Sequence, residues 1–162
     1  MLEEAQKRVR SATLIQQDIT KVRLDQSFDV CTAFRFFLNA QHELRCNALS
    51  AIREHLTENG VLVANIHVNS RSILGVAYRA RNRIARRTIA NTESFENFQS
   101  LLHEYGFSVE DVIWYSYLPR VGWWFSNAAK YALMPVEKAA SRLPFVPESV
   151  AQSFIVIARR QG

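Results

Sequence analysis

The segment from residue 28 to residue 68 constrains the fold more than any other part of the sequence. Phe28 to Phe34 (FDVCTAF) is a nearly continuous apolar run, typical of a strand buried on both faces. Gln41 to Glu58 repeats apolar residues at intervals of three and four, which predicts an amphipathic helix with Asn59-Gly60 as its left-handed stop. Val61 to Val68 (VLVANIHV) predicts a second buried strand. This order predicts a right-handed crossover between two parallel strands.

The flanking segments extend this pattern on both sides. A helix is expected to end near Ser11, and Ala12 to Ile19 (ATLIQQDI) predicts a short strand. Further helices are predicted in the basic segment and from the cap candidates Asn91 to Ser94 as far as Gly106, and further strands at 108–118 and 151–160. With 162 residues, one domain is expected. The fold class is α/β, with about five strands, most of them parallel, and helices on both faces of the sheet.

Positive charge is concentrated in one segment. The net charge is +5, but six arginines and no acidic residue lie between Gly60 and Thr92, so the remainder has a net charge of −1. This distribution removes most of the support for a nucleic-acid partner. The basic helix within residues 70–92 is interpreted as a solvated face, a contact for anionic lipid headgroups, or a contact for an acidic acceptor.

Aromatic residues gather in the segment 119–150, which is expected to be a set of helical pieces inserted between two strands. Trp123 and Trp124 suit a lid over an apolar acceptor pocket, a place in the core, or an anchor at a membrane interface. In the last case, peripheral membrane contact would run through Arg79, Arg83, Arg87, Trp123 and Trp124.

Cysteine usage and hydropathy indicate the cellular setting. Cys31 and Cys46 have neither disulfide-framework nor zinc-site spacing, so free thiols in a reducing cytoplasm are expected and no metal site is predicted. No apolar run approaches the roughly 20 residues that span a bilayer. A cytoplasmic location is therefore expected.

Four of these elements occur in an order that resembles the class I S-adenosylmethionine-dependent methyltransferases. They are the strand ending in QQDIT, the strand FDVCTAFRFFLN, the long helix, and the turn and strand ENGVLVANIHV, and the helix MLEEAQKR before them and the final strand after them fit the same order. The resemblance covers the C-terminal two thirds of the family's domain. It implies a Rossmann-like fold over residues 1–162, S-adenosylmethionine as the cofactor, and methyl transfer to a small, amphiphilic or anionic acceptor. One departure is Thr57-Glu58-Asn59-Gly60, where the family commonly has Lys-Pro-Gly-Gly.

The resemblance also implies a set of site residues. Asp18 and Ile19 would hold the adenine, with Met1 near it, because an acidic residue followed by an apolar one ends the corresponding family strand. Ala33, Phe34 and Arg35 would border the methionine end of the cofactor. His42 follows the same strand and is the weak candidate for a general base, although a histidine at a helix start is usually a surface or capping group.

The family's N-terminal elements have no counterpart in the sequence. A strand with a glycine-rich loop, and a strand whose terminal acid holds the ribose, would lie before Met1, and we expect that roughly 50 or more residues are missing there. A truncated form of the enzyme is expected, with one edge of the strand at Phe28 unpaired. The alternative is a non-catalytic methyltransferase-like subunit that binds a partner chain at that edge, or a membrane-peripheral binding module. A nicotinamide-dependent enzyme is disfavoured because its glycine fingerprint is absent.

Overall fold

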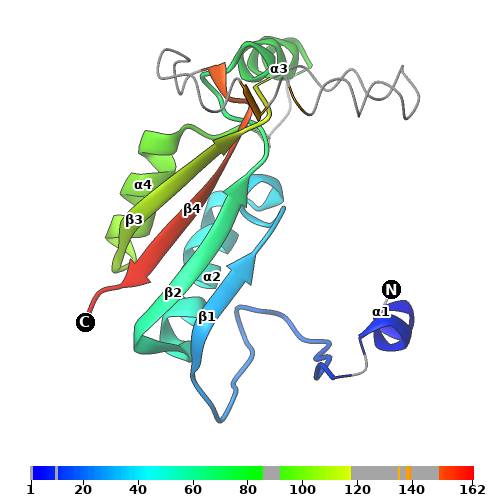
Figure 1. The fold of residues 1–162 in the computed structure, drawn as a ribbon, viewed down its shortest axis with the longest axis vertical. Coiled ribbons are helices and arrows are strands. Elements are labelled where there is room, and N and C mark those ends of the chain that lie inside the picture. Colours follow the sequence, from blue (N-terminus) through cyan, green and yellow to red (C-terminus); the bar gives the residue numbers. More distant parts are fainter. Residues whose placement is uncertain (1, 10, 86–91, 118–134, 136–137, 140–149) are drawn as a thin grey trace.

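A four-stranded sheet forms the centre of the molecule. The computed structural model describes residues 2–9, 11–85, 92–117, 135, 138–139 and 150–162. The strands are β1 (Phe28–Ala33), β2 (Leu56–Ile66), β3 (Phe107–Tyr115) and β4 (Ser153–Arg160), in the order β1-β2-β4-β3 (Figure 1). β1 pairs with β2 in parallel, and β4 is antiparallel to both of its neighbours. β1, β2 and β3 thus run in one direction, as predicted, but the insertion of β4 makes two of the three pairs antiparallel.

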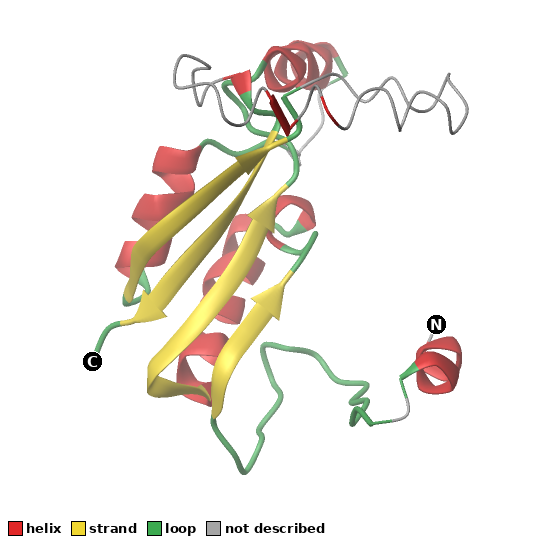
Figure 2. Cartoon of the chain, viewed as in Figure 1, coloured by secondary structure: helices red, strands yellow, loops and turns green. Residues whose placement is uncertain are grey.

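The predicted crossover is confirmed. β1 leads through the short 3-10 helix η1 (Phe37–Asn39) into α2 (His42–His55), and α2 leads into β2. α4 (Phe95–Glu104) connects to β3 in the same way, and both helices lie behind the sheet in Figure 2. The α/β, Rossmann-like architecture expected from the sequence is therefore present.

Both helices pack on one face of the sheet. The hydrophobic core contains Leu49 and Ile52 of α2, Phe98 and Leu102 of α4, and residues of alternate positions along the strands: Leu62, Ala64, Ile66, Phe154, Val156 and Ala158. On the opposite face Val30 is 57% exposed and Ile113 is 47% exposed. Within the described ranges the second helical layer is not found, so the prediction that residues 28–34 are buried on both faces is wrong.

The stop predicted at Asn59-Gly60 is also wrong. α2 ends at His55 and β2 begins at Leu56. Phe28 is opposite Leu56 but Val30 is opposite Val61, so the residues in between form an irregularity within the strand. A Cβ on Gly60 would lie 2.9 Å from the Leu56 Cβ, which explains why glycine is needed there without a left-handed backbone.

The predicted strand at Ala12 to Ile19 is not formed. After α1 (Leu2–Arg8) the described chain continues to β1 without a strand, and Ile15 is 47% exposed. A single segment cannot form a strand without a neighbour to accept its backbone hydrogen bonds, and no other described strand lies beyond β1.

The remaining elements follow the sequence closely. The basic helix is α3 (Ile73–Ile84), capped by Ser72. Ser94 caps α4, and Gly106 ends it at φ 77°, as its position predicts. Most of the predicted insertion at 119–150, with Trp123 and Trp124, lies outside the described residues, as do Met1, Arg86 and Arg87.

Candidate functional site at the carboxyl ends of β1 and β2

The chain turns sharply where β1 ends. Ala33 is half-buried against the core, Phe34 is 53% exposed, and Arg35 has a φ of 59°. A left-handed conformation costs a non-glycine residue roughly 1–2 kcal/mol. The backbone N–H of Arg35 donates to Oδ1 of Asn65 at 2.6 Å, and its carbonyl accepts from Nδ2 of Asn39 at 2.8 Å. These two bonds hold the turn in place.

Asn65 links three strands at this edge. Its side chain is almost fully buried, with the residue 5% exposed. Besides accepting from Arg35, it donates from Nδ2 to the hydroxyl of Tyr115 at 3.1 Å. Tyr115 ends β3, and the next residue, Ser116, also has a positive φ, 63°. Positive φ angles therefore occur at Arg35, which Asn65 contacts, and at Ser116, the residue after Tyr115, and strained backbone positions concentrate at functional sites.

This edge is where an α/β sheet can bind a ligand. Ligands of open α/β sheets lie outside the carboxyl ends of the parallel strands. Ala33, Phe34 and Arg35, which the sequence singled out, lie there, and Phe34 offers an exposed aromatic surface. The structure brings these three together with Asn65 and Tyr115.

Asp18 and Ile19 do not lie at a strand end. The carboxylate of Asp18 accepts from the N–H of Thr20 at 3.0 Å and from its hydroxyl at 2.9 Å through one oxygen, Oδ1. These bonds, the backbone one first, lower the pKa of Asp18 below its ordinary value. Ile19 is 39% exposed. The observed environment of Asp18 is that of a turn cap, and contact with adenine stays a prediction.

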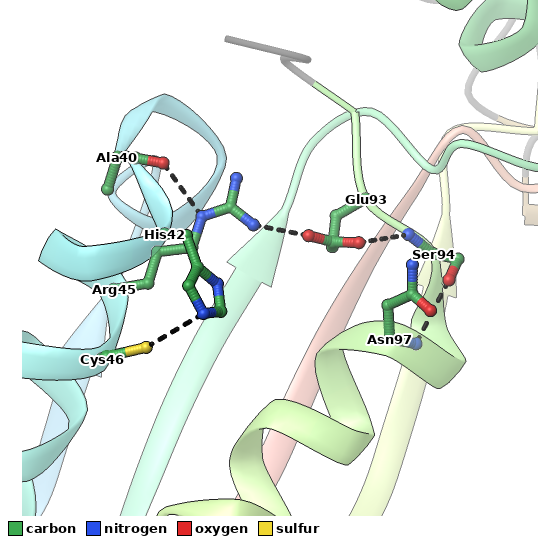
Figure 3. A network of polar contacts seen from close by, with 7 residues as sticks. All are labelled: Ala40, His42, Arg45, Cys46, Glu93, Ser94 and Asn97. Carbon is green, nitrogen blue, oxygen red and sulfur yellow. Dashed lines mark hydrogen bonds and ion pairs between the residues drawn. The ribbon is translucent and has the colours of Figure 1, made fainter. Parts of the chain in front are cut away.

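A second polar network joins the beginnings of α2 and α4 (Figure 3). Arg45 is 9% exposed; its Nε donates to the Ala40 carbonyl at 3.0 Å, and Nη1 contacts Oε2 of Glu93 at 2.5 Å. The other oxygen of Glu93 accepts from the N–H of Ser94. This ion pair fixes the segment that leads into α4 against α2.

His42 lies beside this network at the start of α2. Its Nε2 is 3.6 Å from the Sγ of Cys46, one turn along the same helix (Figure 3). Its role as a base stays a prediction. Both cysteines are free and half-buried, and burial raises the pKa of the Cys31 thiol.

Two open hollows lie at the other end of the sheet. One, of about 450 Å³, is lined by residues of the ends of α2 and α4, among them Arg53 and Tyr105. The other, of about 370 Å³, lies between Arg23 to Ser27 and His55. Neither involves a residue that the sequence analysis selected.

Among the described residues no group of three or more His, Cys, Asp or Glu side chains could hold a metal ion. In the same residues no helix is long and apolar enough to cross a membrane.

Sequence reasoning missed Asn65 and Tyr115 as parts of the site. The signal for Asn65 was a single amide in an otherwise apolar strand, which requires buried hydrogen-bond partners. Tyr115 carried no comparable signal, because its partner lies 50 residues away in the sequence.

No protein-family model matches the sequence, and the search of curated proteins found no match. Solved structures do resemble it. A methyltransferase of Thermotoga maritima, described as S-adenosylmethionine-dependent and as a possible histamine N-methyltransferase, matches with a TM-score of 0.65 and 20% identity over 100% of this chain. The magnesium protoporphyrin IX methyltransferase of Synechocystis PCC 6803, solved with S-adenosylhomocysteine, matches with a TM-score of 0.57 and 13% identity over 99%.

The same architecture occurs in a protein described as a pericyclic reaction enzyme, with a TM-score of 0.64 and 8% identity over 99% of this chain. The present chain spans 69%, 57% and 34% of the lengths of these three structures, in the order given. At these identities the likeness concerns the fold, which can carry several chemistries. The chain has the Rossmann-like fold of the class I S-adenosylmethionine-dependent methyltransferases.

Proposed function

We propose that this chain forms the acceptor-side part of a methyltransferase domain that transfers a methyl group from S-adenosylmethionine to a small molecule. The observation that carries the proposal is the rim at the carboxyl ends of β1 and β2. There Phe34 and Arg35 follow a strained turn that the buried Asn65 anchors, in a sheet with the fold of known methyltransferases.

The residues at this rim fit one end of the cofactor. Arg35 is exposed and carries a permanent positive charge suited to the cofactor's carboxylate, and Phe34 presents an aromatic face for packing. Outside this rim, Oδ1 of Asp18 is engaged by Thr20, which leaves Oδ2 to accept from an adenine amino group. No glycine precedes Gly60, so residues 1–59 supply no glycine-rich loop for the rest of the cofactor.

When bound, the cofactor supplies an electrophilic methyl group on a sulfonium. The contribution of this chain is positioning: the Asn65 anchor fixes the rim, and Arg35 and Phe34 orient what binds there. His42, at the start of α2, would take a proton from an acceptor that is a poor nucleophile. We propose an amphiphilic or anionic acceptor because α3, which follows β2, carries arginines whose positive charge suits a negatively charged group.

The test is calorimetric titration with S-adenosylhomocysteine. It uses the 162-residue chain and, in parallel, the same chain extended by any coding sequence that precedes Met1 in frame. Phe34→Ala and Asp18→Asn should each weaken binding about tenfold or more, the loss expected for one contact of about 1.4 kcal/mol or more.

Matched controls are available on the same elements. Phe28→Ala removes an aromatic ring of 37% exposure at the opposite end of β1, and Asp25→Asn removes an exposed carboxylate from the same connection as Asp18. Both should bind as the parent does. Absence of binding by both folded parents, or equal losses in the controls, would contradict the proposal.

The outer edge of β1 favours a second candidate function. No described strand pairs with that edge, and Val30 is exposed on the adjoining face. Such an edge is a template for a strand of another chain. A non-catalytic subunit would bind its partner there, and Val30→Lys with Thr32→Lys should abolish co-purification while Asp18→Asn leaves it intact.

A further inference from the structure

α3 leaves three of its large apolar residues exposed. Ile73 is 82% exposed, Ile84 is 84% exposed and Val76 is 50% exposed. The side that faces the protein carries Ser72, which is fully buried, Gly75, which is buried, and Asn82, which is 8% exposed, together with the half-buried Leu74 and Tyr78. The apolar stripe, which we define as Ile73, Val76, Ala77, Ala80 and Ile84, is therefore exposed in the described part of the chain.

Backbone contacts fix this orientation. A Cβ at Gly75 would lie 2.0 Å from the carbonyl oxygen of Asn69, so the helix backbone touches the preceding loop. The hydroxyl of Ser72 donates to that carbonyl at 2.7 Å and accepts from the N–H of Gly75 at 3.0 Å. A rotation that buried the stripe would break these bonds and move bulkier residues into the contact.

Arginines border the stripe on both sides. At 3.6 residues per turn, Arg81 lies about 80° to one side of the stripe and Arg83 about 80° to the other, with Arg79 beyond Arg83. All three are exposed, and no carboxylate in the described part of the chain pairs with them. The nearest acidic residues in the sequence, Glu93 and Glu96, pair with Arg45 and Arg71.

We propose that α3 docks on an anionic lipid surface, with the apolar stripe in the boundary between headgroups and acyl chains. A helix with an apolar face and flanking basic residues lies in this plane and binds through buried apolar area and attraction to anionic lipids. A second copy of the chain is a poorer occupant, because apposed stripes would bring two rows of arginines together. Figure 1 shows α3 beyond the carboxyl ends of β1 and β2, so docking would bring the rim toward the lipid.

The test is sedimentation of the 162-residue chain with vesicles of phosphatidylcholine, alone or mixed with phosphatidylglycerol. The parent should bind the anionic vesicles and bind less as salt is added. Ile73→Asp with Ile84→Asp should lower the partition coefficient at least tenfold, and so should Arg79→Glu with Arg83→Glu. All four side chains are exposed, so circular dichroism should show parent-like folding.

Two control pairs match these changes elsewhere. Val9→Asp with Ile15→Asp alters apolar residues of 45% and 47% exposure, and Lys7→Glu with Lys21→Glu makes the same change of charge. Both should bind vesicles nearly as the parent does. The proposal is overturned if the folded parent does not bind anionic vesicles, or if controls and α3 variants lose binding equally. It is also overturned if the α3 variants abolish a concentration-dependent dimer and leave vesicle binding unchanged.

Discussion

At the scale of single residues, Asn65 is predicted to make a large contribution to the free energy of unfolding. Its amide satisfies the backbone N–H of Arg35 and the hydroxyl of Tyr115 from a buried position. Asn65→Ala should lower the free energy of unfolding by about 1–3 kcal/mol, because both partners lose a bond next to a strained turn. Tyr115→Phe, which removes one of the two bonds, should cost about 1 kcal/mol. Urea unfolding measures both, and equal losses would show that the Arg35 bond contributes nothing.

Glu110 provides a pH-dependent contribution on the surface of the sheet. Hydrogen bonds from Arg159, and then the charge of that arginine, lower the pKa of Glu110 below its ordinary value of 4.5. A lowered folded-state pKa means that the pair stabilises the fold fully above the ordinary value and loses this effect as the pH falls through the folded value. Glu110→Gln should therefore flatten the fall in stability below pH 4.5. Arg159→Met should show the same weaker dependence of the free energy of unfolding on pH. If either variant loses stability in acid as steeply as the parent, this assignment is contradicted.

At the scale of elements, the pair of Arg45 and Glu93 holds α2 and α4 in place (Figure 3). The side chains are 11% and 16% exposed, so removal of one partner leaves a poorly solvated charge. Arg45→Met should cost roughly 3 kcal/mol in urea unfolding, whereas the double variant Arg45→Met with Glu93→Leu should recover much of that loss. The exposed pair of Arg23 and Glu54 is the control, and Arg23→Met should cost less than about 1 kcal/mol. A loss at Arg45 no larger than this would refute the buried-pair argument.

The elements that the sequence predicted well are those with local signals. α2 and α4 have apolar stripes at helical spacing, and Ser94 and Gly106 mark the ends of α4 by capping chemistry. The predictions that were wrong concern segments whose structure depends on partners that are distant in the sequence. Ala12 to Ile19 has strand composition but no neighbouring strand, and Asn59-Gly60 serves the packing of Leu56 in β2 rather than a helix end. The rim residues Ala33 to Arg35 could be selected by resemblance, but the anchor at Asn65 depends on contacts 30 and 50 residues away.

At the scale of the whole molecule, the described residues cover one face of the sheet and leave apolar side chains exposed on the other. The core side carries α2 and α4, while alternate residues of the strands, such as Val30, Val63, Ile113 and Ile157, lie on the other side. Exposed apolar side chains gathered on one face indicate a surface that another segment or chain can cover.

The open face predicts how the purified chain behaves with a hydrophobic dye. The 162-residue chain should bind anilinonaphthalene sulfonate at neutral pH, and Val30→Ser with Ile113→Ser should reduce the fluorescence, since both residues are about half exposed. Because these side chains are not in the core, their loss should cost little stability, whereas Leu62→Ala should cost about 2–5 kcal/mol. Ile73→Ser with Ile84→Ser measures the share of dye bound by α3. A monomeric parent with a sharp cooperative melt and no dye binding would show that the open face is covered in solution.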